Sequence, residues 1–160
     1  MPTGVKVLGG LGLLVAGAVA LPQVRDYVSN GHRLWQMERA LASLPHAPRT
    51  LHVSQNARVG LLMGGQGRCD YFVGQLRTCG GSRDAVLAHY RDATIPNPLT
   101  GQAEHVSVLF VTGDPIHEGL VPPDLRRLRA WGLGDGGGDA AAFIVYVLVS
   151  GPANADPRCR

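Results

Sequence analysis

The longest apolar segment of the chain runs from Val7 to Leu21, contains no charged side chain and directly follows Lys6. A short basic region, an apolar stretch and small residues at its end are typical of a secretory signal. The motif Ala18-Val19-Ala20 predicts cleavage after Ala20. If it is not cleaved, segment 5–21 is close to the shortest length that spans a membrane as a helix. We therefore interpret residues 1–21 as a signal peptide or signal anchor, and favour the anchor.

Small residues line one side of this segment, because Gly12, Ala16 and Ala20 lie four positions apart. On a helix this spacing forms a smooth face that allows a neighbouring helix to approach closely. Four glycines between Gly9 and Gly17 would weaken a helix in water. The pattern thus indicates a targeting or tethering role and argues against a place in a globular core.

The pattern then becomes amphipathic over residues 22–48, which we assign to a helix and a linker. Apolar residues recur at steps of three and four, as in a helix with one buried face. Asn30-Gly31 interrupts the pattern and predicts a kink or a break, and the helix expected over 34–44 is followed by proline. We expect it to pack on the domain. The alternative places Trp35 and Arg39 at lipid headgroups.

Beyond residue 48 the chain alternates short apolar runs with glycine and proline, which is typical of strands joined by turns. The strands that we expect span residues 50–53, 59–63, 70–77, 105–112 and 141–149. Gly64-Gly65-Gln66-Gly67 predicts a hairpin turn between the second and third of them. The last run is apolar throughout, which predicts a central strand that is buried on both faces.

Two helices are expected among these strands. Ser82 is a predicted N-cap of a helix over 83–93, and Asp84 suits the positive end of its dipole. Its expected inward residues are Val86, Leu87 and Tyr90. Pro122-Pro123 opens a short basic helix, where proline is tolerated in the first turn. Its expected inward residues are Leu125, Leu128 and Trp131, and a glycine-rich loop follows over 132–138.

The order of these elements predicts an α+β fold. An N-terminal hydrophobic helix precedes a domain over 49–151, and residues 152–160 form a C-terminal tail. Within the domain we expect a mainly antiparallel sheet of about four strands, with helices on one face.

Composition narrows the range of functions. The 160 residues suffice for one domain, and an apolar fraction of 45% argues against global disorder. The net charge of +3 is low for a protein that holds a nucleic-acid backbone, so we expect no nucleic-acid partner.

The three cysteines suggest one disulfide, because an exported chain reaches an oxidising compartment. If Cys69 and Cys79 end one extended strand, they lie about 33 Å apart at roughly 3.3 Å per residue. A disulfide needs Cα atoms within about 7 Å, so this pair is excluded unless the chain bends back at Gly74. We therefore expect Cys159 to pair with Cys69, which leads directly out of a turn, and to hold the tail in place.

Candidate chemistry is confined to one loop and one helix. Asp114, His117 and Glu118, with His105 nearby in the sequence, offer ligands for a divalent metal or an acid–base set. They match no known motif, and solvated loop side chains are the simpler interpretation. We expect no cofactor, because Gly64-Gly65-Gln66-Gly67 is followed neither by the Lys-Ser/Thr of a P-loop nor by a helix.

Three arginines, Arg126, Arg127 and Arg129, form a basic face on the second short helix. They could contact anionic lipid, an acidic partner or a phosphate. The simpler alternative is a solvated face opposite the apolar positions of that helix.

Two segments carry a resemblance to a known class of protein. Arg68-Cys69-Asp70-Tyr71-Phe72-Val73-Gly74 and the serine-capped stretch Ser82 to Tyr90 are similar to segments of small exported or membrane-anchored bacterial α+β proteins. The resemblance covers about a quarter of the chain and implies an α+β fold and an envelope location. It implies no activity and no site residues.

Our first functional hypothesis is a non-enzymatic envelope protein that acts as a binding or structural module. It would contact the membrane through residues 5–21 and would have a protein partner in the envelope. The domain would be anchored in the inner membrane and lie outside the cytoplasm, or be secreted or periplasmic after cleavage. The alternative is an exported enzyme or metal-binding protein that uses the Asp114, His117 and Glu118 loop. A third hypothesis is a minor pilus-like subunit whose first 44 residues form one packing helix, although the usual prepilin glutamate is missing.

Overall fold

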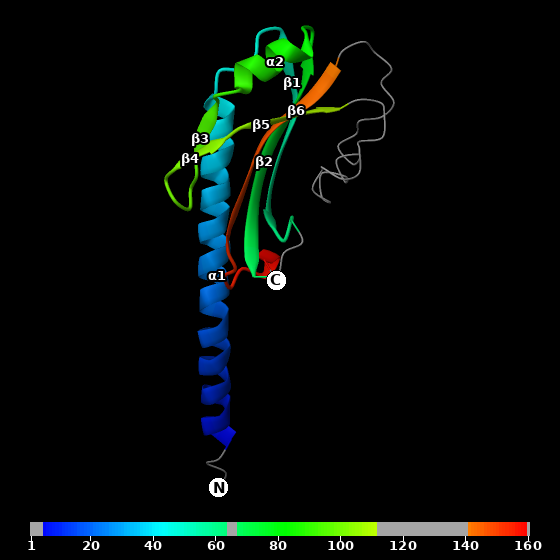
Figure 1. Ribbon diagram of the computed structural model, residues 1–160. Helices are drawn as coiled ribbons and strands as arrows, with labels where there is room; N and C mark the ends of the chain where they lie inside the picture. The colour runs from blue at the N-terminus through cyan, green and yellow to red at the C-terminus, as the bar shows by residue number, and fades with distance from the viewer. Residues whose placement is uncertain (1–4, 64–66, 112–140, 160) are drawn as a thin grey trace.

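The computed structural model describes residues 5–63, 67–111 and 141–159, with the side chains of 21–63, 67–110 and 142–159. Within these ranges the chain forms a long helix and a four-stranded sheet that lies along part of it (Figure 1). The fold is α+β, as predicted. The expected helix at 122–131 and the loop at 132–138 lie outside the described residues. The same holds for three of the four predicted turn residues, 64–66, and for the side chains of Gly12, Ala16 and Ala20.

The sheet is antiparallel at every pairing and has the order β1-β2-β6-β5. Its strands are β1 (Thr50–Gly60), β2 (Arg68–Cys79), β5 (Ser107–Val111) and β6 (Ala141–Pro152). β2 and β6 pair over their whole length, from Arg68 opposite Pro152 to Cys79 opposite Ala141. The predicted hairpin and the central place of the last strand are therefore confirmed.

The first predicted strand pair, 50–53 and 59–63, is wrong in its division. One strand, β1, covers Thr50–Gly60 with a register shift between His52 and Ser54, and residues 61–63 form a turn. Gly60, the last residue of β1, lies against the C-terminal segment. A Cβ there would lie only 2.9 Å from the carbonyl oxygen of Arg158, so this position requires glycine. The turn that follows is held by Asp70, whose Oδ2 accepts the Met63 N–H at 2.8 Å.

The strand predicted at 105–112 is also divided. β4 (Ala103–His105) pairs with β3 (Thr94–Pro96) in a separate two-stranded sheet, whereas β5 joins the main sheet. Val106 lies between them and donates its N–H to the carbonyl of Ala93 at 3.0 Å. The change of partner at this residue ends one strand and begins the next.

Helix α2 (Arg83–Tyr90) has the predicted cap, since the hydroxyl of Ser82 accepts the Ala85 N–H at 3.3 Å. It ends three residues earlier than expected. Val86 and Tyr90 are buried, but Leu87 is exposed, so its predicted inward position is wrong. An eight-residue helix buries only a narrow stripe, and the i, i+4 pair fills it.

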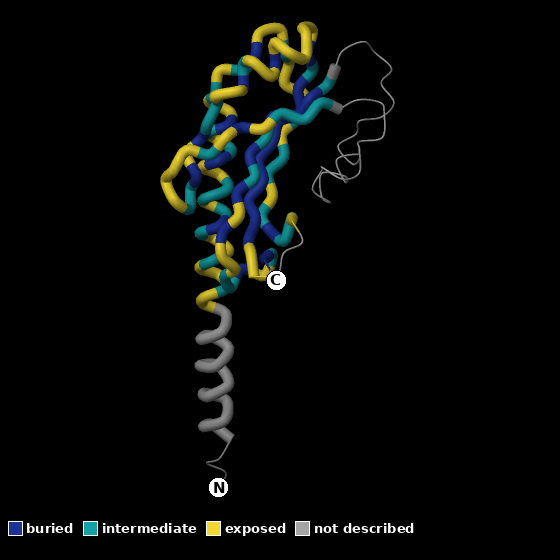
Figure 2. Tube along the Cα trace, viewed as in Figure 1, coloured by how far each residue is buried: buried dark blue, intermediate teal, exposed yellow. Residues whose placement is uncertain are grey.

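Helix α1 (Val5–Ser43) ends two residues before Pro45, close to the predicted end. Its helical backbone continues through Asn30-Gly31, so the predicted break does not occur. Met37 and Leu41 of α1 are buried against the sheet, which confirms that this helix packs on the domain (Figures 1 and 2).

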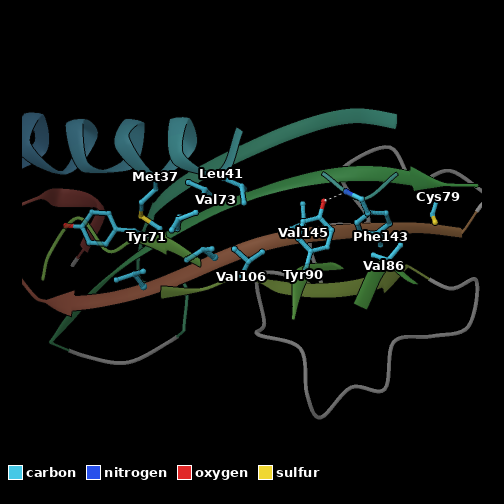
Figure 3. Packing of buried hydrophobic residues seen from close by; sticks show 14 of the residues in the cluster. Met37, Leu41, Tyr71, Val73, Cys79, Val86, Tyr90, Val106, Phe143 and Val145 are labelled. Atoms are coloured by element: carbon cyan, nitrogen blue, oxygen red, sulfur yellow. Dashed lines mark hydrogen bonds between the residues drawn. The ribbon is translucent and has the colours of Figure 1, made fainter. Parts of the chain in front are cut away.

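Both helices cover the same face of the sheet, as expected. The core between them is built from alternate residues of β2 and β6 with one stripe from each helix (Figure 3). Its largest members include Met37, Leu41, Tyr71, Val73, Val86, Tyr90, Phe143 and Val145. The other face of the sheet has a smaller cluster, centred on Phe72, Leu76 and Ile144.

Candidate functional site

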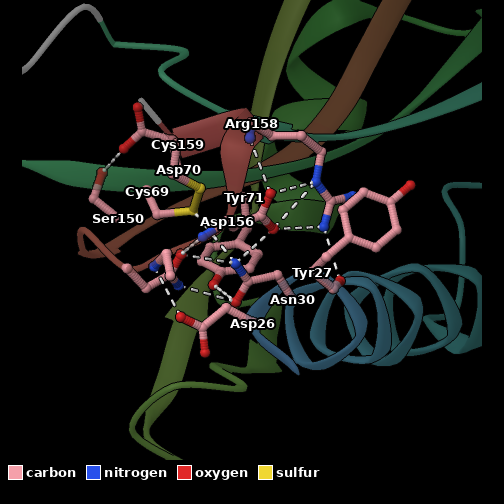
Figure 4. The surroundings of a disulfide bond; sticks show 12 residues. Asp26, Tyr27, Asn30, Cys69, Asp70, Tyr71, Ser150, Asp156, Arg158 and Cys159 are labelled. Atoms are coloured by element: carbon pink, nitrogen blue, oxygen red, sulfur yellow. Dashed lines mark hydrogen bonds and ion pairs between the residues drawn. A yellow bond between two sulfur atoms is a disulfide. The ribbon is translucent and has the colours of Figure 1, made fainter. Parts of the chain in front are cut away.

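A buried polar network fastens the C-terminal segment to the middle of α1. Asn30 is fully buried, and its Nδ2 donates to Oδ2 of Asp156 at 2.8 Å. Its Oδ1 accepts the hydroxyl of Tyr71 at 2.6 Å (Figure 4). One side chain of α1 therefore joins the helix, β2 and the C-terminal segment. We call Asn30, Tyr71, Asp156 and Arg158 the C-terminal latch.

The charge in the latch is carried by Asp156 and Arg158. Asp156 is fully buried and accepts from Nη2 of Arg158 at 2.7 Å and from its backbone N–H at 2.9 Å. Burial raises the pKa of Asp156, but the hydrogen bonds from Arg158 and Asn30 outweigh it and leave the pKa below its ordinary value. The same guanidinium lies 3.9 Å from the centre of the Tyr27 ring and also donates to the Tyr27 carbonyl. The contacts of Arg158 with Tyr27 thus tie the tail to α1.

A disulfide closes the same region. Cys69 at the start of β2 and Cys159 in the 3₁₀ helix η2 (Pro157–Cys159) are bonded, with their Cα atoms 4.9 Å apart and both residues buried. This is the predicted pair. Cys79 remains a free, buried thiol at the far end of β2. The latch and the disulfide together fix a tail that would otherwise fray.

A second polar cluster lies where the linker after α1 meets α2. Nδ1 of His46 and the hydroxyl of Tyr90 share a hydrogen bond at 2.9 Å. Burial, and then the positive charges of Arg77, His52 and His89, lower the pKa of His46 to about 4. Burial also raises the pKa of Tyr90. Both side chains are therefore neutral near pH 7, and their bond joins two parts of the fold.

This lowered pKa predicts acid sensitivity. The folded state favours neutral His46, so its contribution is complete above the unfolded-state pKa of 6.5 and falls as the pH drops towards about 4. We expect a loss of about 1–2 kcal/mol over this window, less than the full shift implies because water reaches part of the ring.

The measurement is urea unfolding across this pH window for the wild type and for His46→Gln, which should have a flatter profile. His32→Gln removes one exposed imidazole and is the matched control. If His46→Gln follows the wild-type curve, His46 is not the group responsible.

The loop and helix residues singled out in the sequence lie outside the described residues. They are Asp114, His117 and Glu118 of the suggested metal or acid–base set, and Arg126, Arg127 and Arg129 of the basic face. His105 is described, and it is exposed in β4 opposite Thr94. In the described part of the chain, no group of three or more His, Cys, Asp or Glu side chains is placed to hold a metal.

Two features of the structure, the latch and one exposed surface, were not predicted from the sequence. No local pattern in the sequence indicates that Asn30 and Asp156 bond to each other, because they are 126 residues apart in the chain. The exposed surface consists of Leu21, Val24, Val28 and Trp35 on α1, which we call the outer stripe. Their side chains are 71%, 60%, 63% and 48% exposed. The seven-residue spacing of Leu21, Val28 and Trp35 was the available signal.

Among the residues whose side chains the structure describes, 21–63, 67–110 and 142–159, no helix is both long and apolar enough to cross a membrane. Comparisons with protein-family models, curated proteins and solved structures found no match to this chain.

Proposed function

We propose that this protein is a non-catalytic envelope module, tethered by the apolar segment 5–21, whose domain binds a partner outside the cytoplasm. The observation that carries the proposal is the latch. A buried hydrogen bond joins Asn30 of α1 to Asp156 near the C-terminus, and Arg158, which is paired with Asp156, donates to the carbonyl of Tyr27 on α1. Because the helix is held in this way, its orientation would fix the orientation of the domain, as a rigid stalk requires.

The exposed surface of α1 also favours a binding role. Contiguous apolar side chains on a protein surface mark interaction sites, whereas single exposed apolar residues are ordinary. The outer stripe follows the same helix that carries the apolar segment, so a partner bound there would lie close to the tether. The enzyme alternative gains no comparable support, because its candidate loop lies outside the described residues.

A pilus-like subunit is the second candidate, and one observation favours it. Helical backbone extends without a break from Val5 to Ser43, and Figure 1 shows α1 continuing well past the end of the sheet. A single long helix is what the hypothesis of one packing helix over the first 44 residues requires. The missing prepilin glutamate still counts against it.

Cell fractionation combined with N-terminal sequencing tests the proposal. The untagged chain is expressed in a bacterial host and followed with an antibody to the domain, so that no tag disturbs the C-terminal latch. We expect it in the membrane fraction with its N-terminus intact, and we expect protease added to spheroplasts to cleave the domain.

Other outcomes have separate meanings. Soluble protein that begins at Leu21 would indicate a secreted module and remove the tether. Protein released by mechanical shearing as filaments would favour the pilus-like subunit. Uncleaved protein in the soluble cytoplasm would contradict the envelope role altogether.

A further inference from the structure

The outer stripe lies on the face of α1 that points away from the sheet. Successive residues of an α-helix are rotated by about 100°, which places the four stripe residues within about 60° of one another. The same rotation centres the stripe about 150° from the buried Asn30, Met37 and Leu41. The domain packs on one side of the helix (Figure 2). The exposed apolar residues form a row on the other side.

The spacing of the stripe is that of a helix-pairing seam. Leu21, Val28 and Trp35 are seven residues apart, and Val24 lies three residues after the first of them. Positions a and d of a coiled-coil heptad have this relation. In the sequence, Val7 and Leu14 also occupy position a, closer to the N-terminus. Position d of the neighbouring heptads is occupied by Gly10, Gly17 and Gly31. Such a repeat over four to five heptads argues for another helix as the occupant, and glycine at one position allows close approach.

The charges beside the stripe favour parallel copies. Arg25, His32 and Arg39 form a row along one flank, at heptad position e. The other flank, position g, carries Tyr27 and Leu34, and the Arg158 guanidinium that lies on the Tyr27 ring is neutralised by Asp156. In a parallel pair the e positions of one helix face the g positions of the other, so the basic rows do not meet. In an antiparallel pair they would meet and repel.

Trp35 forms the upper end of the stripe and is already held in place. Its ring stacks on His32 with centroids 5.6 Å apart, and the Arg39 guanidinium lies 4.9 Å from its centre. A large aromatic side chain that is ordered before binding loses little entropy when it is covered. It can therefore contribute much of the binding free energy at the end of the seam nearest the domain.

We propose that a second copy of this chain docks on the outer stripe, with the two α1 helices parallel and the domains on opposite outer sides. The parallel orientation rests on the proposed function, because copies tethered by the same segment to one membrane point the same way. Closed two-fold pairs are also the commonest assemblies of identical chains.

Cysteine cross-linking of the full-length chain in isolated membranes tests the pair. The background variant Cys79→Ala removes the one free thiol among the described residues. Val28→Cys then places a thiol on the stripe, and Gln36→Cys is the matched control on an exposed helix position about 100° from Trp35. After mild oxidation, we expect at least tenfold more disulfide-linked dimer for Val28→Cys than for Gln36→Cys.

The products separate the possible failures. A dimer from Val28→Cys in soluble fractions would refute the tether but support the pair. Membrane-bound protein that forms no dimer, or that forms equal amounts from both variants, would refute the pair but leave the tether intact. An adduct whose mass differs from twice 16.9 kDa would identify a different partner and overturn the second-copy proposal.

A second variant checks the result without a cross-link. Val28→Asp places a charge in the seam at an exposed position, so the fold should be retained. In mild detergent, the mass of the full-length protein should fall from that of a dimer to that of a monomer. Its melting temperature should stay within a few degrees of that of the wild type diluted until it is monomeric. If Val28→Asp remains dimeric, the stripe is not the interface.

Discussion

A double variant that lacks the disulfide, Cys69→Ala/Cys159→Ala, is expected to lose about 4 kcal/mol of unfolding free energy. The bond joins residues 90 positions apart, and closing a loop of that size removes much of the conformational freedom of the unfolded chain. Both residues are buried, so the truncation also removes packing at the base of the sheet. The loss is measured by urea unfolding of the full-length chain in detergent, followed by circular dichroism.

Reductant and a matched cysteine variant control this experiment. Reductant should lower the stability of the wild type and leave the double variant unchanged. Cys79→Ala removes a buried cysteine that forms no disulfide, and it should cost only about 1 kcal/mol. A wild type that unfolds at the same urea concentration with and without reductant would show that the bond does not stabilise the fold.

The same variant should loosen the C-terminal segment before the rest of the domain. The N–H groups of Ala155 and Arg158 donate to side chains of Asp26 and Asp156, and these bonds depend on where the tail lies. Hydrogen exchange at these amides should accelerate in the double variant under native conditions. Exchange in the centre of β2 should change much less, because β2 is paired on both sides.

Features fixed by neighbouring residues were predicted from the sequence. The Ser82 cap needs only the backbone three residues ahead, and the β1–β2 hairpin pairs two strands that are neighbours in the sequence. For the disulfide, one continuous strand between Cys69 and Cys79 excludes that pair, and the turn before Cys69 favoured Cys69 over Cys79 as the partner of Cys159. In each case the feature behind the prediction lies within about a dozen residues of the chain, although the disulfide itself joins residues 90 positions apart.

Features decided by distant residues were not predicted. Asn30-Gly31 looked like an interruption, because asparagine and glycine are poor helix formers. The side chain of Asn30 is instead satisfied by Tyr71 and Asp156, which lie 41 and 126 residues away. Likewise, Gly60 at the end of β1 has no room for a side chain, because the backbone of Arg158 lies against it. Neither contact leaves a trace in the local pattern of apolar and polar residues.

The latch shows why only part of the site could be predicted from the sequence. The sequence predicts that residues 152–160 form a tail held by a disulfide, which is correct but incomplete. The tail also supplies a fully buried carboxylate, Asp156, and an arginine that neutralises it from two residues away. Buried charges of this kind persist only when they are paired and hydrogen-bonded. Their partners had to be seen in space before the tail could be recognised as part of the packing against α1.

The variant Asn30→Asp is expected to destabilise the protein by about 3–5 kcal/mol near neutral pH, although it changes almost no volume. It replaces an amide donor with a carboxylate beside the buried, ionised Asp156, whose Oδ2 lies 2.8 Å from the present nitrogen. Tyr71 and Arg33 still donate to one oxygen of the new carboxylate, but the other oxygen faces Asp156 with no hydrogen between them. Two buried like charges that lose their hydrogen bond and repel each other cost about this much. Freed from the latch, α1 would be held to the sheet mainly by Met37, Leu41 and the packing around them.

The pH dependence distinguishes this mechanism from a general loss of packing. Two carboxyl groups that share a buried site raise each other's proton affinity, so one of them should bind a proton as the pH falls. The difference in unfolding free energy between Asn30→Asp and the wild type should therefore shrink between about pH 7.5 and about pH 4.5. Ser29→Asp adds the same charge one residue earlier, about 100° around the helix, and should change stability by less than about 0.5 kcal/mol. If the two aspartate variants are equally stable, or if the cost of Asn30→Asp does not vary with pH, the latch does not hold α1 as we infer.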